Sequence, residues 1–341
     1  MKARLYRLGA DPEFVFGWTP DRVMPAFKVI GRTENKEPLL TSYIGTDNHP
    51  ATAELRISPS HSILRMMQEM AHALVTIEQY CASVPSLRGL KMYAHPWVKS
   101  PEGHDNQEGE HLGGHIHSSV LIYDNDLSAL YKAGAAFTEA IPTNLWFTTG
   151  TSGLSTEVLA CVSRIKLRLK KGELIYTPQT YITTLGWLMG VLEKFVPDWG
   201  LRAKRNIHYG TTFDGSMRIQ SSKPPRMAPE SNMAYLHYEY RVPSTWLTHP
   251  WIAYAYLALM KTCMSNFERV AQAAIKYPNE EVTSPLNAYH LLLDRMTLPG
   301  LHLTSDCDML PRALQQIHSH RHIWCKPAEP VNIPAWERLL H

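Results

Sequence analysis

The chain of 341 residues is long enough to form one large α/β or α+β unit with a sizeable buried core. Apolar residues make up 44% of it and charged residues 19%, a composition that excludes global disorder. Its formal net charge of +3 is too small to indicate a nucleic-acid partner or an anionic membrane surface.

Cysteine usage and the chain start favour a cytoplasmic protein. The five cysteines are odd in number and include no close Cys-x-x-Cys pair, which favours reduced thiols. The first residues carry acids where a signal peptide needs an apolar run, so we expect no secretory leader. The longest apolar stretch, residues 251–260, is too short to span a bilayer and predicts a buried helix.

The first third of the chain alternates expected strands with one helix. Strand character is found in four segments, at residues 4–16, 23–30, 51–57 and 90–94. A turn-rich loop at 44–50 precedes the third of them, and a polar loop at 98–112 follows the last. Apolar residues at helical spacing predict a helix over 61–80, with Ser60 as its N-cap.

The rest of the chain has more helical character. We expect strands at 113–122 and 236–242, and helices at 127–140, 183–195 and 250–275. Thr248 is the expected cap of the last helix, with Pro250 in its first turn. Further helices are expected in the tail. Strands mostly precede helices without regular βαβ alternation, which predicts an α+β fold.

Four expected strands carry paired polar residues at positions i and i+2, a spacing that projects both side chains to one face. The pairs are Asp11 with Glu13, Glu54 with Arg56, His115 with His117, and Glu239 with Arg241. Any one pair is typical of a solvated sheet face. Together they supply the carboxylates and imidazoles of a divalent-metal site, and this conjunction favours a functional site.

A basic segment at 202–226 adds positive charge. Its six basic residues, against one acid, are Arg202, Lys204, Arg205, Arg218, Lys223 and Arg226. Alone it is typical of a solvated loop, but beside a metal site it supplies what a triphosphate needs. No P-loop or Gly-x-Gly-x-x-Gly motif occurs, so an ATP site would be of neither the P-loop nor the Rossmann type.

A second candidate metal cluster lies near the C-terminus. Its members are Cys307, His318, His320, His322 and Cys325. Their spacing matches no standard zinc motif, so the pattern favours a histidine-rich helix end on the surface.

The order of the short motifs resembles the phage-type carboxylate–amine ligases, or amidoligases, of the glutamine-synthetase-like superfamily, which also includes the glutamate–cysteine ligases. The motifs span about residues 7–244 and are Gly-x-Asp-Pro-Glu-Phe, Ile-Gly-x-Asp, Glu-Leu-Arg, Gly-Gly-His-Ile-His, Tyr-Gly ahead of an Arg, and Glu-Tyr-Arg-x-Pro-Ser. The resemblance implies an α+β catalytic domain at 1–245, mainly antiparallel sheet with flanking helices. The remainder, 246–341, is expected to be a helical extension packed on the same core.

The resemblance also implies cofactors and site residues, with ATP and Mg²⁺ or Mn²⁺ as the cofactors. The positions similar to metal ligands are Asp11, Glu13, Glu54, His115 and Glu239. The positions similar to nucleotide contacts are His117, Arg205, Tyr209 and Arg218. Arg218 and Arg241 resemble the arginines that stabilise transferred phosphate, and Glu54 or Asp47 would take a proton from the amine. The first-strand acid, Asp11, is shorter than the glutamate common in the superfamily.

The implied activity is an ATP-dependent ligation that joins a carboxylate to an amine through an acyl phosphate. Three alternatives stay open: a metal-dependent hydrolase, a guanidine-type kinase and a non-catalytic binding protein. The expected partners are small-molecule or peptide acids and amines, with a modified nucleobase as a further alternative, and no membrane. Oligomeric assembly also stays open.

Overall fold

The computed structural model describes residues 6–31, 44–46, 52–95, 97–98, 110–123, 166–167, 174–175, 178–196, 217–219, 233–240, 243–277, 282, 284–326 and 329–341. Within these ranges, helices pack on an antiparallel sheet, so the expected mixture of antiparallel sheet and flanking helices is confirmed. Among the described helices, none combines the length and apolar character needed to cross a membrane.

A nine-stranded sheet forms the centre of the described structure, and all its strand pairs are antiparallel. Its main path runs through β12 (Met217–Ile219), β13 (Met233–Tyr240), β9 (Gly114–Tyr123), β1 (Tyr6–Thr19), β4 (Ala53–Leu55) and β3 (Ile44–Thr46). Further partners of β1 are β2 (Arg22–Met24), β5 (Ile57–Ser60) and β6 (Lys91–Tyr93). Separate two-stranded sheets join β7 (Trp97–Val98) to β8 (Glu110–His111) and β10 (Lys166–Leu167) to β11 (Leu174–Ile175).

The long strand β1 separates the apolar core from the polar face of the sheet. Leu8, Ala10, Phe14 and Phe16, which are separated by even numbers of positions, are buried in the main core. Side chains alternate between the two faces of a strand, so Asp11 and Glu13 project to the other face. The period-two pattern of this segment therefore sets which face of the sheet carries the polar residues.

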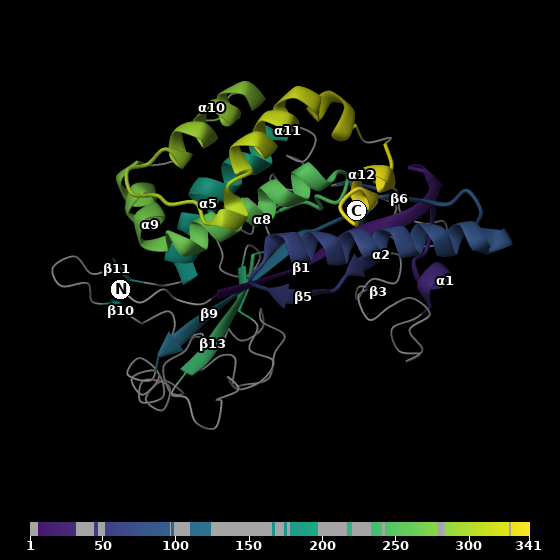
Figure 1. Cartoon of the computed structure of the whole chain (residues 1–341), viewed down its shortest axis with the longest axis horizontal. Coiled ribbons are helices and arrows are strands. Elements are labelled where there is room, and N and C mark those ends of the chain that lie inside the picture. Colours follow the sequence, from purple (N-terminus) through teal and green to yellow (C-terminus); the bar gives the residue numbers. More distant parts are fainter. Residues whose placement is uncertain are drawn as a thin grey trace.

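The helices form a layer on the apolar side of the sheet. The longer ones are α2 (Ile63–Ser83), α5 (Pro178–Phe195), α8 (Pro250–Ser265), α9 (Phe267–Lys276), α10 (Pro285–Met296) and α11 (Leu310–Trp324). The shorter ones are α1 (Phe27–Ile30), η1 (Pro85–Leu87), η4 (Ser305–Cys307) and α12 (Ile333–Glu337). Figure 1 shows α5 and α8 to α11 gathered together, with α2 running beside β5. Residues of β1, α2, α5, α8 and α11 share one core, while the proposed boundary at residue 245 stays a prediction.

Two expected elements near the start of the chain are wrong in their details. The expected strand at 23–30 divides, because β2 ends before Pro25 and α1 follows. Proline has no N–H to donate to a sheet, which accounts for this end. The helix expected from residue 61 begins at Ile63, and its N-cap is Ser62 rather than Ser60, since the Ser62 side chain accepts from the Arg65 N–H.

The long helix expected at 250–275 is two helices, α8 and α9, separated at Asn266. The Asn266 side chain donates to the His302 carbonyl and accepts from the His302 N–H, each at 2.9 Å. These tertiary hydrogen bonds hold Asn266 at the helix end, where asparagine is favoured. The cap of α8 is His249 rather than Thr248, because His249 Nδ1 accepts from the Trp251 N–H at 3.3 Å.

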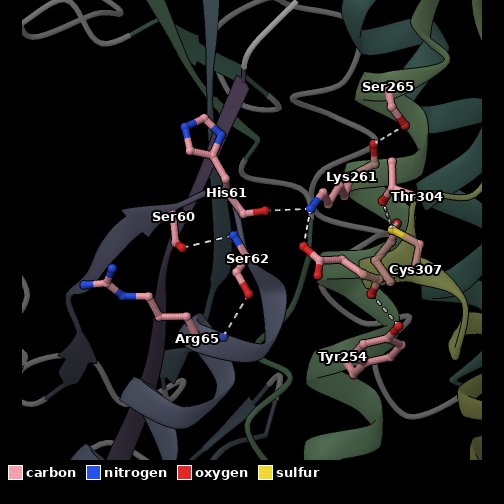
Figure 2. Close-up of polar contacts among 11 residues, drawn as sticks. Ser60, His61, Ser62, Arg65, Tyr254, Lys261, Ser265, Thr304 and Cys307 are labelled. Atoms are coloured by element: carbon pink, nitrogen blue, oxygen red, sulfur yellow. Dashed lines mark hydrogen bonds and ion pairs between the residues drawn. The ribbon is translucent and has the colours of Figure 1, made fainter. Parts of the chain in front are cut away.

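A buried lysine fixes α8 to the start of α2. Figure 2 shows Lys261 reaching from α8 to the backbone of His61, where its Nζ donates to the carbonyl at 2.6 Å. Lys261 also forms an ion pair with Asp306, whose carbonyl accepts from the Tyr254 hydroxyl. The helical layer is therefore tied to the loop that joins β5 to α2.

Candidate functional site

Polar residues from three adjacent strands meet on the sheet face opposite the apolar core. Glu13 on β1 pairs in register with Glu54 on β4, and Asp11 pairs with His115 on β9. His117, two residues further along β9, pairs with Gly9. Directly opposed residues of antiparallel strands project to the same face, so the structure places these five predicted site residues on one face of the sheet.

The register extends this row toward β12. Glu239 on β13 pairs with His117, and Arg218 on β12 pairs with Glu239. The side chains of Glu239 and Arg218 lie outside the described part of the structure. The other predicted site residues also lie outside it, and they are Asp47, Arg205, Tyr209 and Arg241. Their roles stay predictions.

Asp11 lies between two histidines of β9. Its Oδ2 is 3.0 Å from His117 Nε2, and its Oδ1 is 3.5 Å from His115 Nδ1. Burial raises the pKa of the Asp11 carboxyl, but the neighbouring imidazoles of His115 and His117 outweigh burial and hold the pKa well below its usual range. The 3.5 Å separation is an ion pair without hydrogen-bond geometry, and Oδ1 is buried with no hydrogen-bond partner among the described residues.

Glu13 joins the site to the segment ahead of β9. Its Oε2 accepts from the Gly113 N–H at 2.5 Å, while its own N–H donates to the Gly113 carbonyl at 2.8 Å. The Glu13 carbonyl accepts from the Thr245 hydroxyl at 2.6 Å. The side chain and backbone of Glu13 therefore bind the segments at Gly113 and at Thr245, and the first of these leads directly to His115.

Glu54 is held by an arginine two residues away. Arg56 Nε donates to Glu54 Oε1 at 2.6 Å, and Arg56 Nη2 donates to the Thr46 carbonyl on β3 at 3.0 Å. The Glu54 side chain is 12% exposed, whereas that of Arg56 is 43% exposed. The sequence pair Glu-x-Arg is therefore an ion pair with its acid directed inward.

Two buried carboxylates on directly opposed positions are unfavourable by themselves. Glu13 and Glu54 are 6% and 9% exposed, and like charges opposite each other destabilise a sheet. The Gly113 N–H offsets the charge of one, and Arg56 offsets the charge of the other. An arrangement that costs stability in this way is more typical of a functional site than of a sheet surface.

The donor chemistry of this face suits Mg²⁺ or Mn²⁺, which prefer carboxylate oxygens and accept imidazole. The buried Asp11 Oδ1, without a hydrogen bond, fits the same purpose. Within the described ranges, however, no three His, Cys, Asp or Glu side chains converge as a ready metal site. The backbone register places Glu239 of β13 opposite His117, next to this group.

The C-terminal histidines form no metal site in the described structure. His318, His320 and His322 lie on α11, while Cys307 and Cys325 are buried. No metal-holding group of three includes them among the described residues. His318 instead stacks on Tyr289 with ring centroids 4.5 Å apart. All three histidines lie in the second half of α11, and none of them is buried.

Sequence reasoning missed the segment at 243–246. Gly113 bridges Ser244, the Gly114 N–H donates to the Pro243 carbonyl, and Trp246 Nε1 donates to the Gly114 carbonyl. These contacts support the two glycines that precede His115. The available signal was the place of Pro243 and Ser244 at the end of the Glu-Tyr-Arg-x-Pro-Ser motif, which indicates nothing about their contacts.

Comparisons with known proteins leave the family open. No protein-family model matches the sequence, and no curated protein matches it. Weakly similar structures are a bifunctional glutathione synthetase from Pasteurella multocida, with a TM-score of 0.42, 12% identity and coverage of 98% of this chain and 48% of that one. The complex of the prokaryotic ubiquitin-like protein Pup with its ligase PafA has a TM-score of 0.38 and 10% identity, covering 93% and 65%.

A glutamate–cysteine ligase from Francisella tularensis, in complex with AMP, has a TM-score of 0.34 and 10% identity, covering 97% of this chain and 84% of that one. The chain spans about half the length of the glutathione synthetase and about two thirds of the Pup–PafA chain. Likenesses at this level assign no activity, so function is inferred from the residues themselves.

Proposed function

We propose that this protein is an ATP-dependent carboxylate–amine ligase of the phage-type, glutamine-synthetase-like group. One observation carries the proposal: Glu13 and Glu54 are buried opposite each other, beside Asp11 and its two histidines. A concentration of buried negative charge and imidazole on one sheet face is suited to divalent cations and, through them, to a triphosphate. The order of the motifs described above, which resembles that of the carboxylate–amine ligases, supports the reaction class.

In this proposal Asp11, Glu13, Glu54, His115 and Glu239 hold Mg²⁺ or Mn²⁺, which neutralises charge on the phosphates when bound. Glu13 can accept the Gly113 N–H and still offer ligand positions, because a carboxylate has two oxygens with about four acceptor positions. Glu54 can likewise accept from Arg56 and serve as a ligand.

The remaining residues act on the substrates. His117, Arg205, Tyr209 and Arg218 bind the nucleotide, and Arg218 and Arg241 offset charge on the phosphoryl group in flight. An oxygen of the substrate carboxylate attacks the γ-phosphorus of ATP, which gives an acyl phosphate and ADP. The amine then attacks the acyl carbon, phosphate leaves, and Glu54 or Asp47 takes the proton that the amine loses.

Thermal unfolding with ligands tests the proposal. The protein is measured with ATP alone, with Mg²⁺ or Mn²⁺ alone, and with both, because a ligand of the native state at about 100 times its Kd adds about 2.7 kcal/mol of stability. We expect ATP to stabilise only in the presence of metal, and Glu239→Gln to abolish this effect. Glu78→Gln is the matched control, since Glu78 is an acid of α2 paired with Lys91.

The outcomes separate an enzyme that binds ATP with metal from a metal-dependent hydrolase and from a non-catalytic protein, and a stable phosphorylated product in the later screen would identify a kinase. Stabilisation by metal and ATP together, lost in Glu239→Gln and kept in Glu78→Gln, supports a ligase and justifies a screen of acids and amines. Stabilisation by metal without any effect of ATP would favour a metal-dependent hydrolase instead. No effect of either ligand would contradict an enzymatic role for this face of the sheet.

A further inference from the structure

We propose that Arg56 is a positioning residue that fixes the orientation of the Glu54 carboxylate opposite Glu13. The inference rests on the proposed function, in which Glu54 belongs to the metal and amine site. Arg56 itself would touch neither substrate nor metal, and it would act through Glu54.

The contacts of Arg56 restrain it at two points. Its Nε donates to Glu54 Oε1 at 2.6 Å, and its Nη2 donates to the Thr46 carbonyl at 3.0 Å. The first bond joins Arg56 to β4, which ends one residue before it, and the second reaches across to β3. A planar guanidinium that makes two bonds in different directions has a defined orientation, and it transmits that orientation to Glu54.

Glycine at position 45 provides the space for this arrangement. Gly45 on β3 pairs in register with Glu54, so the residue opposite Glu54 has no side chain. A Cβ built on Gly45 would lie 2.6 Å from Arg56 Cζ and 2.9 Å from its Nε and Nη1. The guanidinium therefore occupies the volume that any other residue at 45 would fill. The glycine of the Ile-Gly-x-Asp motif therefore leaves room for the arginine of Glu-Leu-Arg, and the two residues together position Glu54.

Glu54 needs a positioning residue because of the charges around it. Glu13 is directly opposite and buried, and two carboxylates in these positions repel each other. Without a cation on its outer side, Glu54 would be expected to turn away from Glu13. Arg56, on the side away from β1, offsets the charge while keeping the carboxylate in the row.

An alternative role predicts the opposite result. If Arg56 were only a counter-cation that competes with metal for Glu54, its removal would make the site more negative and tighten metal binding. If it positions Glu54, its removal should weaken metal binding, because a change in the groups that hold a metal ligand typically costs 10-fold to 100-fold in affinity. The sign of the change therefore distinguishes the two roles.

The experiment titrates Mn²⁺ into the full-length protein and measures free Mn²⁺ by electron paramagnetic resonance. The variants are Arg56→Gln, which removes the charge, Arg56→Lys, which keeps the charge but lacks the planar guanidinium with its donors on separate nitrogens, and Gly45→Ala, which keeps both charged residues and displaces the guanidinium. Arg65→Gln is the matched control, because Arg65 forms an exposed ion pair with Glu69 at 3.1 Å on α2. Thermal unfolding without metal reports whether each variant is folded.

We expect the Mn²⁺ affinity to fall by about 10-fold or more in Arg56→Gln, Arg56→Lys and Gly45→Ala, and to stay unchanged in Arg65→Gln. Unchanged or tighter binding by folded Arg56→Gln, or wild-type affinity in folded Gly45→Ala, overturns the positioning role while leaving the proposed function intact. If the wild-type protein binds no Mn²⁺, the proposed metal site fails and the inference fails with it.

Discussion

Glu13 Oε2 accepts a hydrogen bond of 2.5 Å from the backbone N–H of Gly113, 100 positions later in the chain. This contact makes Glu13 a structural residue as well as a candidate metal ligand, because it holds the segment directly before β9 that leads to His115. The two roles can be separated, since a hydrogen-bond acceptor at this position needs no charge.

Substitutions at Glu13 test this double role. Glu13→Gln retains an acceptor for the Gly113 N–H, so we expect its free energy of unfolding in urea to stay within about 1 kcal/mol of wild type. Glu13→Ala leaves a buried N–H unsatisfied and should cost about 1–3 kcal/mol. Both variants should lose Mn²⁺ binding. Equal stability of Glu13→Ala and Glu13→Gln would contradict the structural part of the role.

The close approach of Gly114 to Trp246 predicts a strong effect of a single methyl group. A Cβ on Gly114 would lie 2.5 Å from both the Ser244 carbonyl oxygen and Trp246 Nε1. Trp246 is fully buried, so Gly114→Ala should destabilise the fold by about 1–3 kcal/mol through overpacking.

A second glycine provides the control for this variant. Gly186 lies within α5, and a Cβ there would meet nothing within 4 Å. Gly186→Ala should raise stability by about 0.5–1 kcal/mol, because alanine is favoured over glycine inside helices. Chemical denaturation of both variants measures the contrast, and a stable Gly114→Ala protein would show that Trp246 does not pack as described.

The ion pair between Lys261 and Asp306, at the junction shown in Figure 2, predicts an asymmetric mutational effect. The Lys261 side chain is 10% exposed and that of Asp306 is 29% exposed. Asp306→Ala leaves the more buried charge unpaired and should cost about 3 kcal/mol or more, since removing one partner of a buried pair is strongly destabilising. Lys261→Met should cost less, because Asp306 can be rehydrated.

A double-mutant cycle measured by urea denaturation checks this expectation. The combined variant should lose less stability than the two single variants together, since neither charge is then left alone. Additive losses would mean that the two side chains do not interact, and a larger loss in Lys261→Met would reverse the proposed asymmetry.

His249 predicts a loss of stability in acid. Burial lowers the pKa of its imidazole to about 3, assisted by the positive charge of Arg338 and of His320. The ring caps α8 and stacks on Trp324 with centroids 3.7 Å apart. It stays neutral in the native state, while the unfolded chain takes up a proton near pH 6.5. The contribution of His249 to the free energy of unfolding is therefore fully present above pH 6.5. It falls as the pH drops toward 3, by at most about 1.4 kcal/mol per pH unit.

His249→Asn tests this pH dependence. Asparagine keeps a capping acceptor but cannot be protonated, so its unfolding free energy should fall less steeply between pH 6.5 and 4 than that of wild type. His72→Asn, at an exposed position of α2, is the matched control and should follow the wild-type curve. An unchanged slope in His249→Asn would assign the acid sensitivity to other groups.

Local patterns were sufficient to predict much of the fold. The alternation of polar and apolar residues placed Asp11 with Glu13, and His115 with His117, on single strand faces, because this geometry depends only on a repeat of two. Helical spacing identified α2 and the buried helix α8 for the same reason. The helix break at Asn266 was not predicted, because it depends on hydrogen bonds to His302, which is distant in sequence.

The sequence by itself determined which residue types are available for the site and which of them share a strand face. Only the tertiary structure decided that Glu13 lies opposite Glu54, that Asp11 lies between His115 and His117, and that Arg56 occupies the space above Gly45. Strand order and register join segments tens of residues apart, and they follow from the packing of the whole apolar face against the helices. No local pattern contains that information, which is why the members of the site could be named from the sequence but not their contacts.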